Sequence, residues 1–216
     1  LIQNRSYLRD DRLIVTLGTR FDDHTEYTGE ISPSIRAVYN LTDTTRLKAD
    51  YGQGFSAPDL RRASDSYDFT FTTFPLSFIG NPDLEPERSE SYSIGLEHDD
   101  GQRRYGITLF RNNIRDLIEA RCIDNCDGGA TMADPEVREY QNVDSARTQG
   151  VEVNAEHRFE GGALVRANYT YLDAIDRDSG ERLERRPQQR FNLLTEVVTW
   201  PGARAHVRAE YTGSDR

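Results

Sequence analysis

Residues 163–171 read ALVRANYTY, and every second residue from Ala163 onward is apolar or aromatic. In a β-strand successive side chains point to opposite faces, so Ala167, Tyr169 and Tyr171 share one face. Arg166 and Asn168 lie on the other face. A strand of this kind separates an apolar environment from a polar one.

The same alternation recurs along the chain, and with a weaker segment at the N terminus it predicts about ten strands. The other segments are 13–21, 35–41, 47–51, 92–96, 105–109, 151–155, 191–193 and 205–211. No segment shows a helical period. The second face of these strands carries charged and amide side chains: Arg20, Arg36, Lys48, Asp50, Glu152, Asn154, Arg166, Asn168, Arg208 and Glu210.

The connections between the predicted strands alternate between short and long. Tight turns rich in Gly, Asp and Pro are predicted at 9–11, 42–44, 99–102, 160–162 and 200–202. Longer links are predicted at about 23–31, 56–87, 122–138 and 173–189. Because short and long connections take turns, all the short ones fall at one end of the sheet and all the long ones at the other.

This arrangement predicts an all-β fold, a transmembrane antiparallel β-barrel of which the chain supplies about ten strands. A soluble β-sandwich is the alternative. Its dry core would not accept the charged second face, and a link of about 30 residues is unusual in a sandwich. No window approaches the roughly 18 consecutive apolar residues of a membrane-spanning helix.

Charge and histidine placement exclude other classes of function. The chain has 37 acidic and 27 basic residues and a formal net charge of −10, which repels a phosphate backbone, so no nucleic-acid partner is expected. No nucleophile, base and acid fall into a catalytic order, so no enzyme activity, cofactor or resident metal is expected. The histidines are scattered over different segments: His24, His98, His157 and His206.

Five motifs in series give the chain a family resemblance. They are YGQGFSAPDL (51–60), GNPDLEPERSESYSIGLE (80–97), FRNNIRDLIEA (110–120), YQNVDSARTQGVEV (140–153) and YTYLDA (169–174). In their order and spacing they resemble the carboxyl-terminal barrel region of TonB-dependent outer-membrane receptors, along essentially the whole chain. Each motif alone is weak, whereas the series is specific.

The resemblance implies a 22-stranded barrel, plugged by an amino-terminal domain and integral to the bacterial outer membrane. Such receptors import scarce chelates with energy delivered by the TonB complex through the plug, and they contact outer-membrane lipid and lipopolysaccharide. Residues 1–216 are then part of a single receptor β-barrel domain, and the plug and the last strands are expected to be absent from it.

A ferric siderophore, catecholate-like, is the expected ligand of such a receptor. The alternatives are a receptor for haem or vitamin B12, or a passive porin-like barrel. The motif pair GFSAP and NPDL resembles the flanks of the haem-binding loop of haem receptors. Residues 56–87 contain no histidine, however, which disfavours haem.

The link at 56–87 is the predicted ligand surface because it combines aromatic rings with cations, which suits flat, anionic aryl chelates. The candidate residues are Arg61, Arg62, Tyr67, Phe69, Phe71 and Phe74, with Phe78 beside them. The alternatives are a loop that packs on itself and an aromatic girdle at the lipid boundary. Arg185 and Arg186, in another link, could meet an anionic ligand or face lipopolysaccharide.

Two further features of the links are structural predictions. Residues 81–87 contain Pro82 and Pro86, which fix φ and remove hydrogen-bond donors, so this segment is predicted to be a stiff elbow at the mouth of a strand. Cys122 and Cys126 are the only cysteines in the chain. The implied outer-surface location is oxidising, so they are predicted to form a local disulfide.

Overall fold

The computed structural model describes residues 1–23, 29–177, 179–183, 186–200 and 203–214, with the backbone alone described for Val143 and Asp144. In these residues the chain forms twelve strands and no helix, and therefore no helix of the length and apolarity of a membrane span. The strands are β1 (Ile2–Leu8), β2 (Leu13–Asp22), β3 (Glu30–Asn40), β4 (Thr45–Ser56), β5 (Asp68–Thr70), β6 (Leu76–Ile79), β7 (Glu87–Asp99), β8 (Arg103–Asp124), β9 (Glu136–Arg158), β10 (Leu164–Asp176), β11 (Gln189–Trp200) and β12 (Ala203–Thr212).

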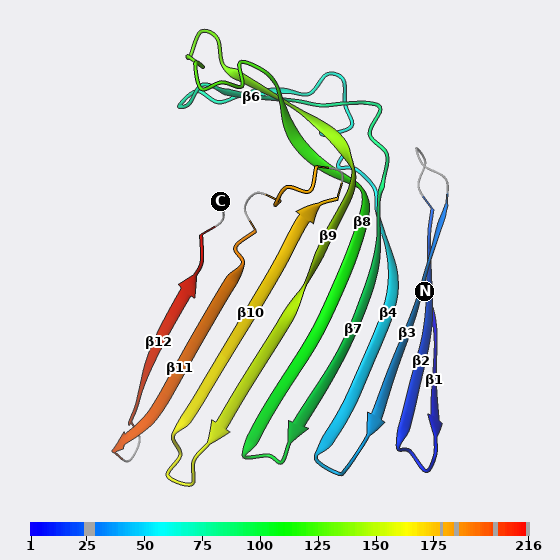
Figure 1. Cartoon of the computed structure of the whole chain (residues 1–216), viewed down its shortest axis with the longest axis vertical. Helices are drawn as coiled ribbons and strands as arrows, with labels where there is room; N and C mark the ends of the chain where they lie inside the picture. Colours follow the sequence, from blue (N-terminus) through cyan, green and yellow to red (C-terminus); the bar gives the residue numbers. More distant parts are fainter. Residues whose placement is uncertain (24–28, 178, 184–185, 201–202, 215–216) are drawn as a thin grey trace.

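Ten of these strands form one antiparallel wall in chain order, from β1 through β4 and then from β7 through β12. Figure 1 shows the described short turns, residues 9–12, 41–44, 100–102 and 159–163, at one end of this wall, called here the turn end. The links 57–86 and 125–135 lie at the other end, the loop end. The predicted number of barrel strands is confirmed, and so is the alternation of short and long connections where the chain is described. Residues 24–28, 178 and 184–185 of two predicted links lie outside the described residues. Within the described residues the wall is open, since β1 and β12 are its two edges.

The turns use the residue types that the sequence indicated. Asp10 and Asp11 have φ of 54° and 62°, and Gly101 and Gly162 have φ of 88° and 79°. Aspartate tolerates this left-handed conformation better than most residues, and glycine adopts it freely. At the turn after β7, the backbone N–H of Arg103 and then that of Gln102 donate to the Asp100 carboxylate and lower its pKa. Pro201 and Gly202 of the last predicted turn lie outside the described residues.

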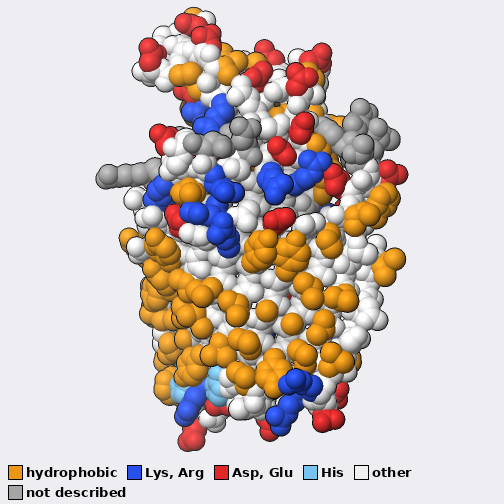
Figure 2. Space-filling model, turned by 45° about the vertical axis from the view of Figure 1, so that its right-hand side comes forward, with side chains coloured by type: hydrophobic (Ala, Val, Ile, Leu, Met, Phe, Trp, Pro, Cys, Tyr) orange, Lys and Arg blue, Asp and Glu red, His pale blue; other side chains and the backbone are white. Residues whose placement is uncertain are grey.

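The strand register aligns the apolar face into rows that cross the wall. One row crosses from β2 to β12 and contains Leu13, Tyr39, Leu47, Leu96, Ile107, Val153, Tyr169, Phe191 and Tyr211. Figure 2 shows apolar side chains as a broad band toward the turn end, with charged side chains on either side of it. A continuous exposed band of this kind requires an apolar partner, and a lipid bilayer supplies one.

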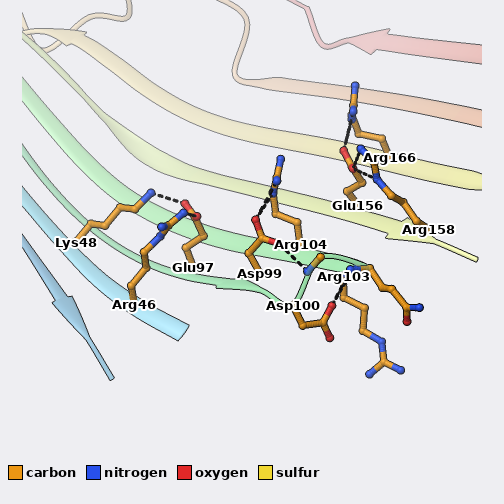
Figure 3. A network of polar contacts seen from close by, with 12 residues as sticks. Arg46, Lys48, Glu97, Asp99, Asp100, Arg103, Arg104, Glu156, Arg158 and Arg166 are labelled. Atoms are coloured by element: carbon orange, nitrogen blue, oxygen red, sulfur yellow. Dashed lines mark hydrogen bonds and ion pairs between the residues drawn. The ribbon is translucent and has the colours of Figure 1, made fainter. Parts of the chain in front are cut away.

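The opposite face carries charges that pair across the strands (Figure 3). Glu97 accepts hydrogen bonds from Arg46 and Lys48 on β4. Glu156, only 7% exposed, accepts bonds of 3.0 Å from Arg158 and 2.8 Å from Arg166. Each carboxylate is thus held by two cations, which offsets the cost of withdrawing it from water.

The structure departs from the sequence-based expectations at the loop end. β8 and β9 are 22 and 23 residues long, whereas a transmembrane strand needs about 9–11. Their loop-end parts continue above the wall as a two-stranded extension, called here the ribbon. The link predicted at 122–138 therefore shortens to 125–135. The link at 56–87, predicted as a long connection, contains the hairpin β5–β6.

The hairpin joins the ribbon by strand pairing. β10 pairs with β9 as far as Ala146, and farther along β9 another strand takes its place. Residues 76–79 of β6 pair with residues 136–139 of β9 in parallel orientation. The hairpin therefore has a defined position, at the top of Figure 1.

Candidate functional site

The predicted ligand loop is organised by the β5–β6 hairpin. Phe69 lies opposite Phe78, and Thr70 lies opposite Ser77. The Ser77 hydroxyl donates to Asp68 over 3.1 Å and lies 3.1 Å from the Thr70 hydroxyl. These cross-strand bonds close the hairpin and present its aromatic side chains as a unit.

Phe71 stands at the centre of an aromatic cluster. Its ring centroid lies 4.9 Å from that of Phe69, 5.3 Å from that of Phe74 and 6.1 Å from that of Phe78. Phe78 also stacks on Tyr140 of β9, with 6.0 Å between the centroids. Phe69 and Phe74 nevertheless remain 47% and 53% exposed, so their rings are available to a ligand.

The two predicted arginines have different environments. The Arg62 guanidinium lies 5.1 Å from the centroid of the Tyr140 ring, a cation–π contact within the protein. Arg61 is exposed, and its side chain makes no hydrogen bond or ion pair in the part of the chain that the structure describes. Arg61 is therefore the cation that remains available at this loop.

Tyr67 and Arg186 are the remaining predicted residues that the structure describes. Tyr67 lies at the base of the hairpin, where its carbonyl accepts a bond of 2.9 Å from the Gly80 N–H, and among the described residues its ring has no aromatic contact. Arg186 is exposed in the link between β10 and β11, and Arg185 lies outside the described residues. These two arginines remain a prediction.

The alternatives for the aromatic loop can now be compared with its position. The alternative of a loop that packs on itself holds for Phe71 and Phe78, because their rings contact other aromatic rings. The girdle alternative is not supported, because the hairpin pairs with β9 well beyond Ala146, where β10 ends. The exposed rings of Phe69 and Phe74 thus lie above the apolar band.

Sequence reasoning missed a second feature of the loop end. A pocket of about 320 Å³ lies between the β8–β9 ribbon and a segment that contributes Asp176, Ser179 and residues 181–183. Arg121, Arg138 and Arg182 are part of its lining. Arg121 donates a bond of 3.1 Å to Asp176, which is only 7% exposed. No pattern in the sequence joins these residues, since the ion pair spans 55 positions.

The predicted disulfide between Cys122 and Cys126 is confirmed. It joins the end of β8 to the following link. We expect Cys122 and Cys126 to resist alkylation in the exported protein without reductant, and both to be alkylated after reduction. Mass spectrometry of the proteolytic peptide that contains them measures both states, and alkylation of both cysteines before reduction would contradict the assignment.

The described residues contain no group of three or more His, Cys, Asp and Glu side chains that could hold a metal ion. What the loop offers chemically is stacking on exposed rings together with a free guanidinium.

The fold and the loop together define a class: a segment of a membrane β-barrel wall that carries a structured aromatic loop above it. The family model described as TonB dependent receptor-like, beta-barrel, matches residues 2–216. The chain belongs to this family.

Named relatives include receptors for different ligands. The chain is 25% identical over 222 residues to the ferric enterobactin receptor of Pseudomonas aeruginosa, covering 93% of the chain and 30% of the relative. It is 28% identical over 194 residues to heme/hemopexin utilization protein C of Haemophilus influenzae (80% and 27%), and 30% identical over 198 residues to vitamin B12 transporter BtuB of Photobacterium profundum (90% and 29%). The chain spans less than a third of the length of these relatives.

Solved structures show the same fold. A ferric enterobactin receptor variant of Pseudomonas aeruginosa, in complex with enterobactin, superimposes with a TM-score of 0.77 at 22% identity, covering 98% of this chain and 32% of that one. The siderophore receptor PirA of Acinetobacter baumannii gives a TM-score of 0.72 at 25% identity, covering 92% and 30%. The barrel-wall architecture is therefore shared with siderophore receptors.

Proposed function

We propose that the receptor containing this chain binds a ferric siderophore, catecholate-like, and imports it actively across the bacterial outer membrane. The observation that carries the proposal is the aromatic hairpin above the wall, with Phe69 and Phe74 47% and 53% exposed. Relatives named as ferric enterobactin receptors support the choice of ligand class. The relative named as an iron-regulated outer membrane virulence protein supports the location.

The hairpin acts by binding, without making or breaking covalent bonds. The aryl rings of a catecholate chelate stack on exposed phenylalanine rings, and the guanidinium of Arg61 attracts the negative charge of the chelate. Iron is cargo in this process. Energy for release into the barrel comes from the TonB complex, which acts through a plug domain. The wall itself faces outer-membrane lipid and, at its loop end, lipopolysaccharide.

Haem and vitamin B12 are the competing ligands, because relatives carry both names. Residues 57–86 contain no histidine that could coordinate haem iron. Vitamin B12 carries no net negative charge that would use the exposed Arg61. A passive porin is disfavoured by the family, whose members depend on TonB.

The proposal is tested by uptake in cells. An iron-starved strain that lacks its own receptors is complemented with the full-length gene and supplied with ferric enterobactin, haemin or cyanocobalamin as single probes. We expect labelled iron to enter from ferric enterobactin, and uptake to stop when tonB is deleted. Uptake of haemin or cyanocobalamin alone would overturn the ligand class, and uptake that persists without tonB would overturn active import.

A further inference from the structure

The predicted elbow, residues 81–87, is held by a side chain that belongs to another strand. The Asn142 carbonyl oxygen accepts the backbone N–H of Glu85 over 2.8 Å. The Asn142 amide nitrogen donates to the carbonyl of the same Glu85 over 2.9 Å. One side-chain amide thus pairs with both backbone groups of a residue, as a neighbouring strand would.

This pairing compensates for the chemistry of the elbow. Pro86 has no N–H, so the elbow cannot continue a regular ladder of backbone hydrogen bonds. Leu84 is only 3% exposed and Pro86 is buried, so the segment lies tightly against the protein. A backbone N–H or C=O that lacks a hydrogen-bond partner in such a position is unfavourable. Asn142 supplies the partners that the backbone does not find in a strand.

The same amide also reaches a kink in β8. Its nitrogen donates to the Asp116 carbonyl over 2.6 Å. Asp116 has a φ of 57°, a left-handed conformation that interrupts an extended strand. Ile118 lies opposite Asn142 in the register, and its N–H donates to the Glu87 carboxylate over 2.8 Å. Asn142 of β9 is therefore hydrogen-bonded both to the elbow and to the kink in β8.

Above this junction the loop is fixed to the ribbon a second time. Residues 76–79 pair with residues 136–139, and Phe78 stacks on Tyr140. Residues 57–80 and the ribbon thus form one body, called here the arm, which carries the exposed Phe69 and Phe74. The attachment at Asn142 lies close to where the arm leaves the wall, because Ala146 is the last residue of β9 that pairs with β10.

We propose that Asn142 is a positioning residue, which fixes the arm relative to the wall and thereby sets the affinity of the aromatic hairpin for its ligand. The effect on affinity rests on the proposed function, whereas the mechanical role does not. Asn142 acts through its hydrogen bonds to Glu85 and Asp116, at the base of the arm.

The test uses Asn142→Asp in the full-length receptor. The introduced carboxylate keeps the shape of the amide but has no N–H, so two carbonyl oxygens lose their donor and face a negative charge. Gln141→Glu is the matched control. It makes the same chemical change one residue earlier on β9, where the amide donates to Glu139 over 2.7 Å and does not contact the elbow.

Two readouts separate positioning from ligand contact. Spin labels on cysteines introduced at Thr73, on the hairpin, and Thr42, at the turn end, report the position of the arm by their distance distribution. Ferric enterobactin is the binding probe. We expect Asn142→Asp at pH 7.5 to broaden the distance distribution and to weaken binding of ferric enterobactin about fivefold, an effect of the size that the loss of a hydrogen bond typically has. We expect Gln141→Glu to leave the distance distribution and the affinity close to those of the wild type.

A change of pH adds a signature that general destabilisation would not give. The carbonyl oxygens of Glu85 and Asp116 favour the protonated carboxyl, whereas the single N–H of Glu85 favours the charged form. With two acceptors against one donor, we expect the pKa of the introduced carboxyl to be raised above the usual value. Protonation restores one donor. We therefore expect the distance distribution of Asn142→Asp to narrow again as the pH falls toward about 5, above the ordinary Asp pKa of about 3.9.

The outcomes are distinguishable. An unchanged distribution in Asn142→Asp, or equal broadening in Gln141→Glu, would overturn the positioning role. Broadening that does not narrow at low pH would also overturn the hydrogen-bond explanation. Broadening with unchanged affinity supports the positioning role and contradicts the hairpin as the ligand surface.

Discussion

Ala167→Arg is expected to impair assembly of the barrel severely. Ala167 lies on the apolar face of β10, between Ala155 of β9 and Leu193 of β11 in the register. A lipid-facing arginine costs about 2–4 kcal/mol at the bilayer midplane and less toward the interface. Refolding of the full-length receptor into lipid vesicles from urea measures the loss of free energy of unfolding.

Asn168→Arg is the control at the adjacent position. Asn168 lies on the polar face, between Asn154 and Asn192, where the neighbouring rows already hold paired charges. We expect an effect of less than about 1 kcal/mol there, as for an exposed charge. Equal losses in the two variants would remove the basis for assigning one face to lipid and the other to the lumen.

The double variant Phe69→Ala and Phe74→Ala is expected to weaken binding of ferric enterobactin at least about tenfold, which corresponds to 1.4 kcal/mol. These two rings are exposed, whereas Phe71 packs among the other rings and its removal would disturb the hairpin itself. Arg61→Gln should weaken binding further and reduce its dependence on salt. Equilibrium titration of the purified full-length receptor measures both effects.

Phe159→Ala is the matched control for the loss of an exposed aromatic ring. Phe159 is 49% exposed, but it lies in the turn after β9, at the opposite end of the wall. Its removal should leave the affinity unchanged. Wild-type affinity in a well-assembled Phe69 and Phe74 variant would mean that other parts of the receptor hold the ligand.

The barrel wall could be predicted because its two faces meet different surroundings. Residues on the outer face, such as Val153 and Tyr169, are apolar, and residues on the inner face, such as Asn154 and Asn168, are polar. Apolar and polar residues therefore alternate along each strand. The turns were also predictable, since Asp10, Asp11 and Gly101 adopt a backbone conformation that few residues tolerate. Both signals are local in the sequence.

The arrangement of the arm could not be predicted, because it depends on contacts between distant residues. Asn142 and Glu85 are 57 positions apart, and no spacing rule joins an asparagine to an elbow. Tyr140 lies in the same motif as Asn142, yet only the structure shows Phe78 and Arg62 packed against it. The parallel pairing of β6 with β9 follows from where β10 ends, which the pattern alone does not fix.

The most direct test of the central claim is the position of bound iron. Crystals of the full-length receptor grown with ferric enterobactin give an anomalous difference peak at the iron. We predict that this peak lies at the loop end, with the aryl groups of the chelate against Phe69 and Phe74 and the Arg61 guanidinium directed toward them. An iron peak held elsewhere in the receptor, with both rings free of ligand, would contradict the account.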